Sequence, residues 1–127
     1  MENKLRIGVF GTWRGNAYIK AVKYVDEAVV TALCDKAPAR IEEAKKNCPP
    51  DVAVFDNFDD FIESGLFDAV FICNYFNEHA QYAIRAMEKG IHVLSENMAA
   101  STMALCVKLC RAVEKTGCKY MMAENYP

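Results

Sequence analysis

The chain has 127 residues, enough for one domain with a hydrophobic core but too few for two ordinary domains. Its 15 basic and 17 acidic residues give a formal charge of −2 without a basic run, which argues against a nucleic-acid interface. Hydrophobic residues make up 53% of the chain, yet no apolar run is long enough for a membrane span or a secretory signal, so we expect a cytoplasmic protein that binds no membrane.

Six short apolar runs predict β-strands. In chain order they are Leu5–Phe10, Ala28–Cys34, Val52–Phe55, Asp68–Cys73, Ile91–Ser95 and Cys118–Met122. Apolar residues recur at helical spacing in four of the gaps, around residues 18–25, 58–62, 80–87 and 103–110. Pro38–Asn47 predicts a charged helix with proline in its first turn. Strands that alternate with helices imply a parallel sheet that is covered on both faces.

Glycines and small polar residues mark the expected ends of the helices. Three glycines each follow a helical stretch and precede a strand, where a left-handed C-terminal cap is favoured: Gly65, Gly90 and Gly117. Three residues have the side chains that N-terminal caps prefer: Asn57, Asn77 and Ser101. These end signals agree with the alternating pattern of strands and helices.

The six cysteines and two histidines form no metal-binding pattern. The chain has no C-x-x-C pair, whereas a zinc site would need closer pairs than Cys106 and Cys110. We expect reduced, mostly buried thiols and no metal. His92 lies within an expected strand and is interpreted as structural. His79 lies in the first turn of an expected helix, either at the ligand rim or in a packed or capping role, and neither histidine has a visible triad partner.

The first expected strand runs into Gly11-Thr12-Trp13-Arg14-Gly15 and then into a helix. Such a turn lets backbone N–H groups approach a pyrophosphate at the positive end of the helix. The G-x-G-x-x-G fingerprint is incomplete: either Trp13 replaces the second glycine, or one residue is missing and Gly15 is the last glycine. By itself the turn fits a phosphate site and a simple tight turn equally well.

Asp35 ends the second expected strand and follows Gly11 at close to the ~20-residue spacing of the acid that binds the adenosine ribose. A carboxylate there accepts hydrogen bonds from a diol and repels a 2′-phosphate, which favours NAD over NADP. A solvated loop acid or a helix N-cap is the alternative. Lys36 and Arg40 lie close by in the sequence, so NADP stays open.

Polar residues follow the fourth and fifth expected strands. They are Asn74, Tyr75, Ser95, Glu96 and Asn97, and a further polar cluster, Glu124-Asn125-Tyr126, follows the sixth strand. Ligands of open parallel sheets bind at the carboxyl ends of the strands, so these side chains are candidates for a binding rim. The alternative is that they are ordinary polar loop residues.

Together these segments resemble the N-terminal domain of the glucose–fructose oxidoreductase / inositol dehydrogenase (Gfo/Idh/MocA) family. The matching pieces are LRIGVFGTWRG, VVTALCDKAPARIEEA, FDAVFIC, EHAQYAIRAMEKGIHVLSE and the helix that ends in VEKTGCKYMMAENY. The resemblance implies an α/β fold, a doubly wound Rossmann sheet of six strands in the order 3-2-1-4-5-6, spanning residues 1–127. It also implies an NAD(P)-dependent oxidoreductase that acts on a sugar or cyclitol.

The cofactor contacts implied by the resemblance are Gly11, Thr12, Trp13, Arg14, Gly15, Asp35, Asn74, Tyr75, His79 and Glu96. The first five would bind the pyrophosphate, and the aspartate would bind the adenosine ribose. The last four would lie on the nicotinamide side, with the glutamate at the nicotinamide ribose.

Two positions depart from the family pattern. Asn74-Tyr75 replaces the usual Thr-Pro after the fourth strand, and Glu96-Asn97-Met98 replaces the usual Glu-Lys-Pro after the fifth. The family's lysine helps to position cofactor and substrate and assists proton transfer. Asparagine hydrogen-bonds but is no general acid or base at neutral pH, so the catalytic residues stay unassigned.

Two alternatives to a dehydrogenase follow from this departure. Some relatives in the superfamily are glycosidases that retain NAD, oxidise the sugar transiently, and also lack the lysine. The other alternative is a nucleotide-binding module without catalysis.

We expect the family's C-terminal α+β domain, which carries most of the substrate pocket, to be missing from this chain. We therefore expect a fragment or truncated form with little activity of its own. Sheet surface that the second domain normally covers would be exposed and apolar, which predicts a homo-oligomer.

Overall fold

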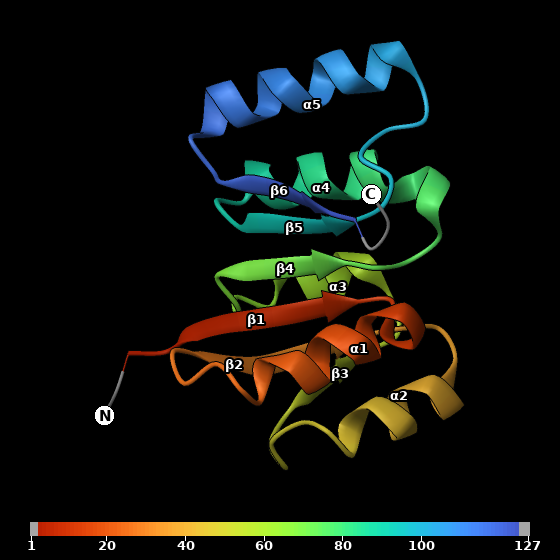
Figure 1. Cartoon of the computed structure of the whole chain (residues 1–127), viewed down its shortest axis with the longest axis vertical. Coiled ribbons are helices and arrows are strands. Elements are labelled where there is room, and N and C mark those ends of the chain that lie inside the picture. Colours follow the sequence, from red (N-terminus) through yellow and green to blue (C-terminus); the bar gives the residue numbers. More distant parts are fainter. Residues whose placement is uncertain (1–2, 125–127) are drawn as a thin grey trace.

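Six parallel strands form one sheet in the order β3-β2-β1-β4-β5-β6 in the computed structural model, which describes residues 3–124 (Figure 1). The strands are β1 (Leu5–Phe10), β2 (Ala28–Cys34), β3 (Ala53–Phe55), β4 (Ala69–Ile72), β5 (His92–Glu96) and β6 (Tyr120–Ala123). The predicted α/β class and strand order are confirmed. Of the polar cluster expected after the sixth strand, Asn125 and Tyr126 lie outside the described residues.

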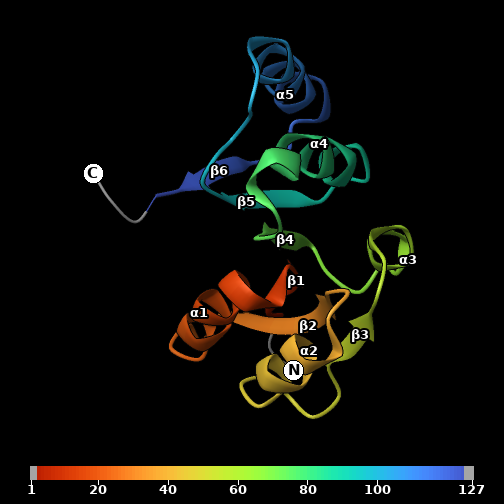
Figure 2. The ribbon, with the colours of Figure 1, turned by 90° about the vertical axis from the view of Figure 1, so that its right-hand side faces the viewer.

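Helices cover both faces of the sheet. They are α1 (Thr12–Val22), α2 (Pro38–Lys45), α3 (Phe58–Glu63), α4 (His79–Glu88) and α5 (Met103–Thr116), and a short 3₁₀ turn, η1 (Phe76–Glu78), precedes α4. α1 and α2 pack on one face, and α3, α4 and α5 pack on the other (Figure 2). Because the central strands are buried on both faces, they form near-continuous apolar runs in the sequence.

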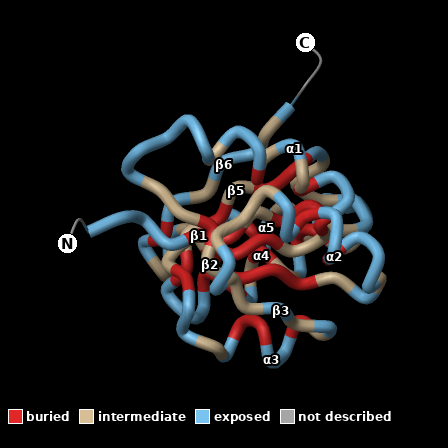
Figure 3. The backbone as a smooth tube through the Cα atoms, turned by 90° about the horizontal axis from the view of Figure 1, so that it is seen from below, coloured by how far each residue is buried: buried red, intermediate tan, exposed pale blue. Residues whose placement is uncertain are grey.

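Each face has its own hydrophobic core. Beneath α1 and α2 the buried residues are Ile7, Val9, Ile19, Val30, Leu33, Ile41 and Ala44. The larger core on the other face includes Phe58, Phe61, Phe67, Val70, Ile72, Met87, Val93 and Leu109. Figure 3 shows the buried residues concentrated along the central strands. These two cores fix the strand ends, which in turn place the polar residues that follow them.

Most helix ends follow local sequence chemistry. The three glycines expected in the left-handed region have φ angles of 68°, 79° and 71°, at Gly65, Gly90 and Gly117. Asn57 caps α3 as predicted, by accepting the Asp60 amide at 2.9 Å. The predicted cap at Ser101 is wrong: the next residue, Thr102, accepts the Leu105 amide at 3.2 Å. Both residue types are favoured at N-caps, so the helix boundary was misplaced by one residue.

The predicted cap at Asn77 is also wrong. Asn77 lies inside η1, and the Glu78 amide donates to the Tyr75 carbonyl at 3.0 Å. The chain therefore turns before the helix begins, and α4 starts at His79. This turn separates the end of β4 from α4 and holds Tyr75 at the carboxyl edge of the sheet.

The six cysteines are all free thiols. Cys34, Cys73 and Cys118 are buried, whereas Cys110 is exposed, so the expectation of mostly buried thiols holds for half of them. Among residues 3–124, no group of three or more His, Cys, Asp or Glu side chains is arranged to hold a metal ion. No helix in the same part of the chain is long and apolar enough to cross a membrane.

Candidate functional site

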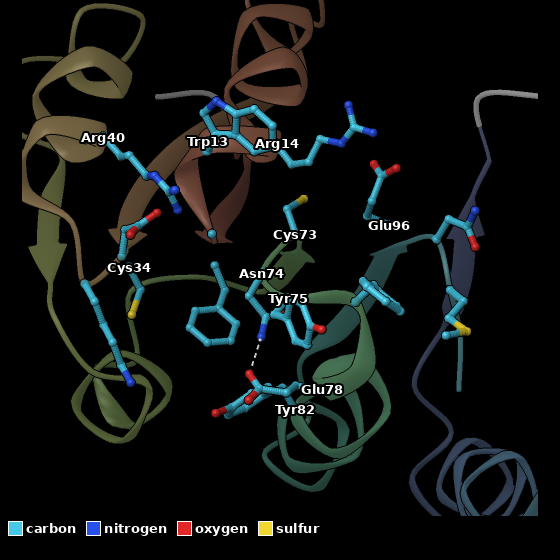
Figure 4. A pocket seen from close by; sticks show the side chains of 17 residues that line it. Trp13, Arg14, Cys34, Arg40, Cys73, Asn74, Tyr75, Glu78, Tyr82 and Glu96 are labelled. Atoms are coloured by element: carbon cyan, nitrogen blue, oxygen red, sulfur yellow. Dashed lines mark hydrogen bonds between the residues drawn. The ribbon is translucent and has the colours of Figure 1, made fainter. Parts of the chain in front are cut away.

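A cavity of about 800 Å³ opens at the carboxyl edge of the sheet, where β1, β2, β4 and β5 end (Figure 4). Its lining consists of Phe10, Gly11, Trp13, Arg14, Cys34, Asp35, Lys36, Arg40, Cys73, Asn74, Tyr75, Phe76, Glu78, Tyr82, Glu96, Asn97 and Met98. Small-molecule sites typically have volumes of about 300–1,000 Å³. The cavity also lies where open parallel sheets bind their ligands.

The glycine turn closes one side of the cavity. Gly11 has a φ of 89°, and a Cβ added to it would lie 2.5 Å from the backbone nitrogen of Asn74. A Cβ added to Gly15 would lie 2.5 Å from Cγ1 of Val9, so this glycine allows α1 to pack closely on β1. That is the role of the last glycine in the dinucleotide fingerprint. The structure thus favours the alignment in which one residue is missing from the turn.

The N-terminus of α1 faces the cavity. The first N–H groups of a helix lack acceptors within the helix. The Thr12 amide donates to Oδ2 of Asp35 at 2.9 Å, and the Thr12 hydroxyl donates to the same oxygen at 3.0 Å. The amides of Trp13 and Arg14 belong to the same uncapped first turn, and both residues line the cavity. The N–H groups of these two residues can donate hydrogen bonds to an anion bound at the positive end of the helix.

Asp35 joins the beginnings of α1 and α2. Its Oδ1 accepts the Ala37 amide at 2.9 Å, in addition to the two bonds from Thr12 to Oδ2. An ionised carboxylate offers about four acceptor sites, so Oδ1 keeps one site for a further donor. The aspartate thus stabilises the start of a helix, which was the alternative considered for it, and it also lines the cavity.

Trp13 stands at the mouth of the cavity between two arginines. Its ring is 70% exposed. The guanidinium carbons of Arg14 and Arg40 each lie 5.9 Å from the ring centroid, within the range of a cation–π contact. Figure 4 shows these three side chains along the side of the cavity formed by α1 and α2. The tryptophan thus brings positive charge from both helices to the same rim.

Asn74 supplies an unsatisfied acceptor at the end of β4. Its Nδ2 donates to Oε2 of Glu78 at 3.1 Å. Its Oδ1 is buried and has no hydrogen-bond partner among the described residues. Both residues line the cavity. A buried acceptor without a donor is costly, and a ligand N–H or O–H would satisfy it.

His79 is buried behind the wall of the cavity and does not line it. Its Nδ1 lies 2.8 Å from the Glu96 carbonyl oxygen and 3.2 Å from the Met98 carbonyl oxygen, and its Nε2 lies 2.9 Å from the Asn74 carbonyl oxygen. The ring therefore connects the ends of β4 and β5. Thr12 and Gly15 are likewise buried and outside the lining. Of the two roles considered for His79, its buried position agrees with the packed role and not with a place at the ligand rim.

Glu96 ends β5 on the opposite side of the cavity from Asp35, and only 8% of it is exposed. The hydroxyl of Tyr18 in α1 donates a hydrogen bond to Oε2 of Glu96. Desolvation, followed by this hydrogen bond, raises the pKa of Tyr18 above its ordinary value. In the sequence Tyr18 begins the apolar stripe of the helix expected around residues 18–25, and nothing in its local spacing points to a residue so far along the chain as Glu96.

Asn97 lines the cavity next to Glu96. The backbone N–H of Asn97 donates a hydrogen bond to the backbone carbonyl of Ala123 in β6 at 3.1 Å. Two thiols at this edge stay protonated at neutral pH: burial raises the pKa of Cys34 to about 12 and raises that of Cys73 as well. Neither thiol is therefore an activated nucleophile.

The model of the family described as "Oxidoreductase family, NAD-binding Rossmann fold" (Gfo/Idh/MocA) matches residues 5–124. The chain belongs to this family. The match agrees with the glycine turn, the acid after β2 and the strand order.

Two curated relatives have different activities in their names. Glycosyl hydrolase family 109 protein 1 of Bacteroides fragilis is 32% identical over 130 residues, covering 95% of this chain and 28% of the relative. Myo-inositol 2-dehydrogenase of Thermotoga maritima is 31% identical over 93 residues, covering 72% of this chain and 28% of the relative. The chain therefore spans about 28% of the length of these Gfo/Idh/MocA-like relatives.

Solved structures share the fold. Scyllo-inositol dehydrogenase of Lactobacillus casei, crystallised with NAD(H) and scyllo-inositol, superposes with a TM-score of 0.83 at 24% identity over 94% of this chain and 36% of that one. The WlbA dehydrogenase of Bordetella pertussis, crystallised with NADH and UDP-GlcNAcA, gives 0.85 at 22% identity over 97% and 36%. At these identities the likeness shows the fold alone.

Proposed function

We propose that this Gfo/Idh/MocA domain binds NAD across the carboxyl edge of its sheet. The observation that carries the proposal is one continuous cavity that joins the start of α1, the Asp35 carboxylate and the Glu96 carboxylate. The Trp13 and Arg14 amides would hold the pyrophosphate, Asp35 the adenosine ribose, and Glu96 the nicotinamide ribose. NAD bound there supplies a hydride acceptor, and NADH supplies a hydride donor.

The residues present fit such a dinucleotide. The Asp35 carboxylate keeps an acceptor site for a ribose hydroxyl. Asn74 presents a buried acceptor that lacks a donor. A nucleotide with hydroxyl and amide donors complements both groups.

For the whole protein we propose hydride transfer to or from a sugar or cyclitol. The names of the inositol dehydrogenases among its relatives support this substrate class. Within this domain Asn97 can orient a cofactor or substrate by hydrogen bonds, but it cannot transfer a proton at neutral pH. The proton donor or acceptor would then be another residue of the whole protein, for example one in the region that corresponds to the rest of the relatives' length.

An NAD-dependent glycosidase is the second candidate. Two observations favour it: relatives named glycosyl hydrolase family 109 match 95% of the chain, and Asn97 stands where a dehydrogenase of this family has lysine. The two candidates differ in their net redox balance. A dehydrogenase releases NADH, whereas this kind of glycosidase regenerates its NAD in each turnover.

The full-length protein separates these candidates when NADH absorbance and released sugar are followed together. The assay uses NAD with a panel of free sugars, cyclitols and aryl glycosides. NADH formation without sugar release supports the dehydrogenase, and sugar release without net NADH supports the glycosidase. If NAD binds but neither signal appears with any compound, both catalytic proposals are contradicted and a nucleotide-binding module is left.

Replacing Asp35 by alanine is expected to weaken NAD binding by roughly 10- to 150-fold, since a hydrogen bond to a charged group contributes about 1.5–3 kcal/mol. NADP binding is expected to fall less, because the same change removes a negative charge that opposes the 2′-phosphate. Isothermal titration calorimetry of this chain with both cofactors measures the difference.

Asp51→Ala is the matched control, because Asp51 is exposed and lies outside the cavity. It should bind both cofactors as the unaltered chain does. If Asp35→Ala weakens NAD and NADP equally, Asp35 only supports the turn through Thr12 and Ala37. If the unaltered chain binds neither cofactor at millimolar concentration, the proposed cofactor is wrong.

A further inference from the structure

Glu96 is a buried carboxylate that forms no ion pair within residues 3–124. Burying a carboxylate is costly unless hydrogen bonds replace its water. In the family pattern a lysine follows this glutamate, but here Asn97 follows it. The side-chain hydrogen bond that compensates Glu96 comes instead from a distant helix, through the hydroxyl of Tyr18.

The ring of Tyr18 is itself held in place. It packs against the ring of Phe71 in β4, with centroids 5.7 Å apart and ring planes inclined at 58°. This contact fixes the direction in which the hydroxyl points, because a packed tyrosine has few rotamers left. The donor is therefore presented to Glu96 by the packing of α1 on the sheet.

The backbone of Glu96 is anchored as well. Its carbonyl accepts the Ser95 hydroxyl at 3.0 Å and lies 2.8 Å from Nδ1 of His79. With Oε2 engaged by Tyr18, Oε1 is the carboxylate oxygen left for the cavity that Glu96 lines. Figure 4 shows the Glu96 carboxylate beside Arg14, on the far side of the cavity from Arg40.

We infer that Tyr18 is a positioning residue: it holds the Glu96 carboxylate so that its free oxygen receives the hydroxyls of the nicotinamide ribose. This inference rests on the proposed binding of NAD. An ionised carboxylate only accepts hydrogen bonds, so its natural partner in a dinucleotide is a ribose diol. Tyr18 acts through Glu96 and does not itself line the cavity.

Tyr18→Phe tests the inference because it removes the hydroxyl and keeps the ring on Phe71. Calorimetric titration with NAD and with ADP, which lacks the second ribose, separates the two halves of the site. We expect Tyr18→Phe to weaken NAD binding about tenfold, because the Glu96 carboxylate loses the donor that holds it in place. ADP binding should be unchanged, because ADP lacks the ribose proposed to contact Glu96. Tyr24→Phe is the control, because Tyr24 is 90% exposed.

Glu96→Gln and the double variant supply a second measurement. If both residues act on the same ribose, the double variant should bind NAD no more weakly than the weaker single variant. Absorbance titration of the phenols adds a readout that needs no cofactor: a late-ionising tyrosine should disappear in Tyr18→Phe and ionise at lower pH in Glu96→Gln.

Equal losses for NAD and ADP in Tyr18→Phe would show a general structural role and overturn the inference. Unchanged NAD binding in Tyr18→Phe would overturn it too, while leaving the proposed function intact. Failure of the unaltered chain to bind NAD would overturn both, even if the phenol titration confirmed the contact between Tyr18 and Glu96.

Discussion

Gly11→Ala should abolish NAD binding and destabilise the fold by about 3 kcal/mol or more, from backbone strain and overpacking together. Gly11 has a φ of 89°, which alanine adopts only with strain. The new Cβ would also lie 2.5 Å from the carbonyl carbon of Cys73 and from the nitrogen of Asn74. Because these are backbone atoms at the end of β4, relief requires the strand end to move. Urea denaturation and calorimetry with NAD measure the two effects.

Gly90→Ala is the matched control for this change. Gly90 has a φ of 79°, and a Cβ added to it would meet no atom within 4 Å. The control therefore carries only the left-handed backbone cost of roughly 1–2 kcal/mol, and Gly90 is not among the residues that line the cavity. Similar losses of stability in both variants would mean that the close approach of Gly11 to β4 is unimportant. NAD binding by Gly11→Ala at normal affinity would contradict the role of the turn.

Phe61→Ala should cost about 3–5 kcal/mol of unfolding free energy, the range for large buried aromatic residues. Phe61 has no exposed surface. Its ring centroid lies 4.5 Å from that of Phe67 and 6.2 Å from that of Phe10, which lines the cavity. A void at this position would thus weaken the core between α3 and the sheet and loosen one wall of the site. Thermal and urea unfolding measure the loss of stability.

Phe76→Ala is the corresponding control, since its ring is 46% exposed at the rim of the cavity. Its effect on stability should stay within about 0.5 kcal/mol, as is usual for surface positions. If Phe61→Ala lowers the free energy of unfolding no more than this control, the packing of Phe61 does not contribute substantially to the stability of the core. Phe61→Leu keeps most of the volume and gives an intermediate loss if the full deletion prevents folding.

The sheet was predictable because burial on both faces leaves a strong local signal. Each central strand is an apolar run of strand length, and the glycines that end three helices mark the borders between elements. The error at Ser101 arose because the next residue, Thr102, is an equally plausible cap, and the error at Asn77 arose because a 3₁₀ turn precedes α4. Neither the turn before α4 nor the choice between Ser101 and Thr102 is marked by a signal in the residue types alone.

The site was only partly predictable. Glycine spacing and strand ends located Gly11, Asp35 and Glu96, because these positions follow from the order of the elements. The contact of Tyr18 with Glu96 joins residues 78 positions apart, and it exists only because α1 packs across β4. In the sequence, Tyr18 is indistinguishable from any other residue on the buried stripe of an amphipathic helix.

The three hydrogen bonds to Asp35 have a consequence for the kinetics of ligand capture. They hold the start of α1 and the start of α2 in fixed relation before any ligand arrives. The conformational entropy of the residues at these two helix starts is therefore lost when the chain folds and not when the nucleotide binds. A site ordered in advance needs no slow rearrangement after encounter, so association should follow a single concentration-dependent phase in stopped-flow fluorescence of Trp13.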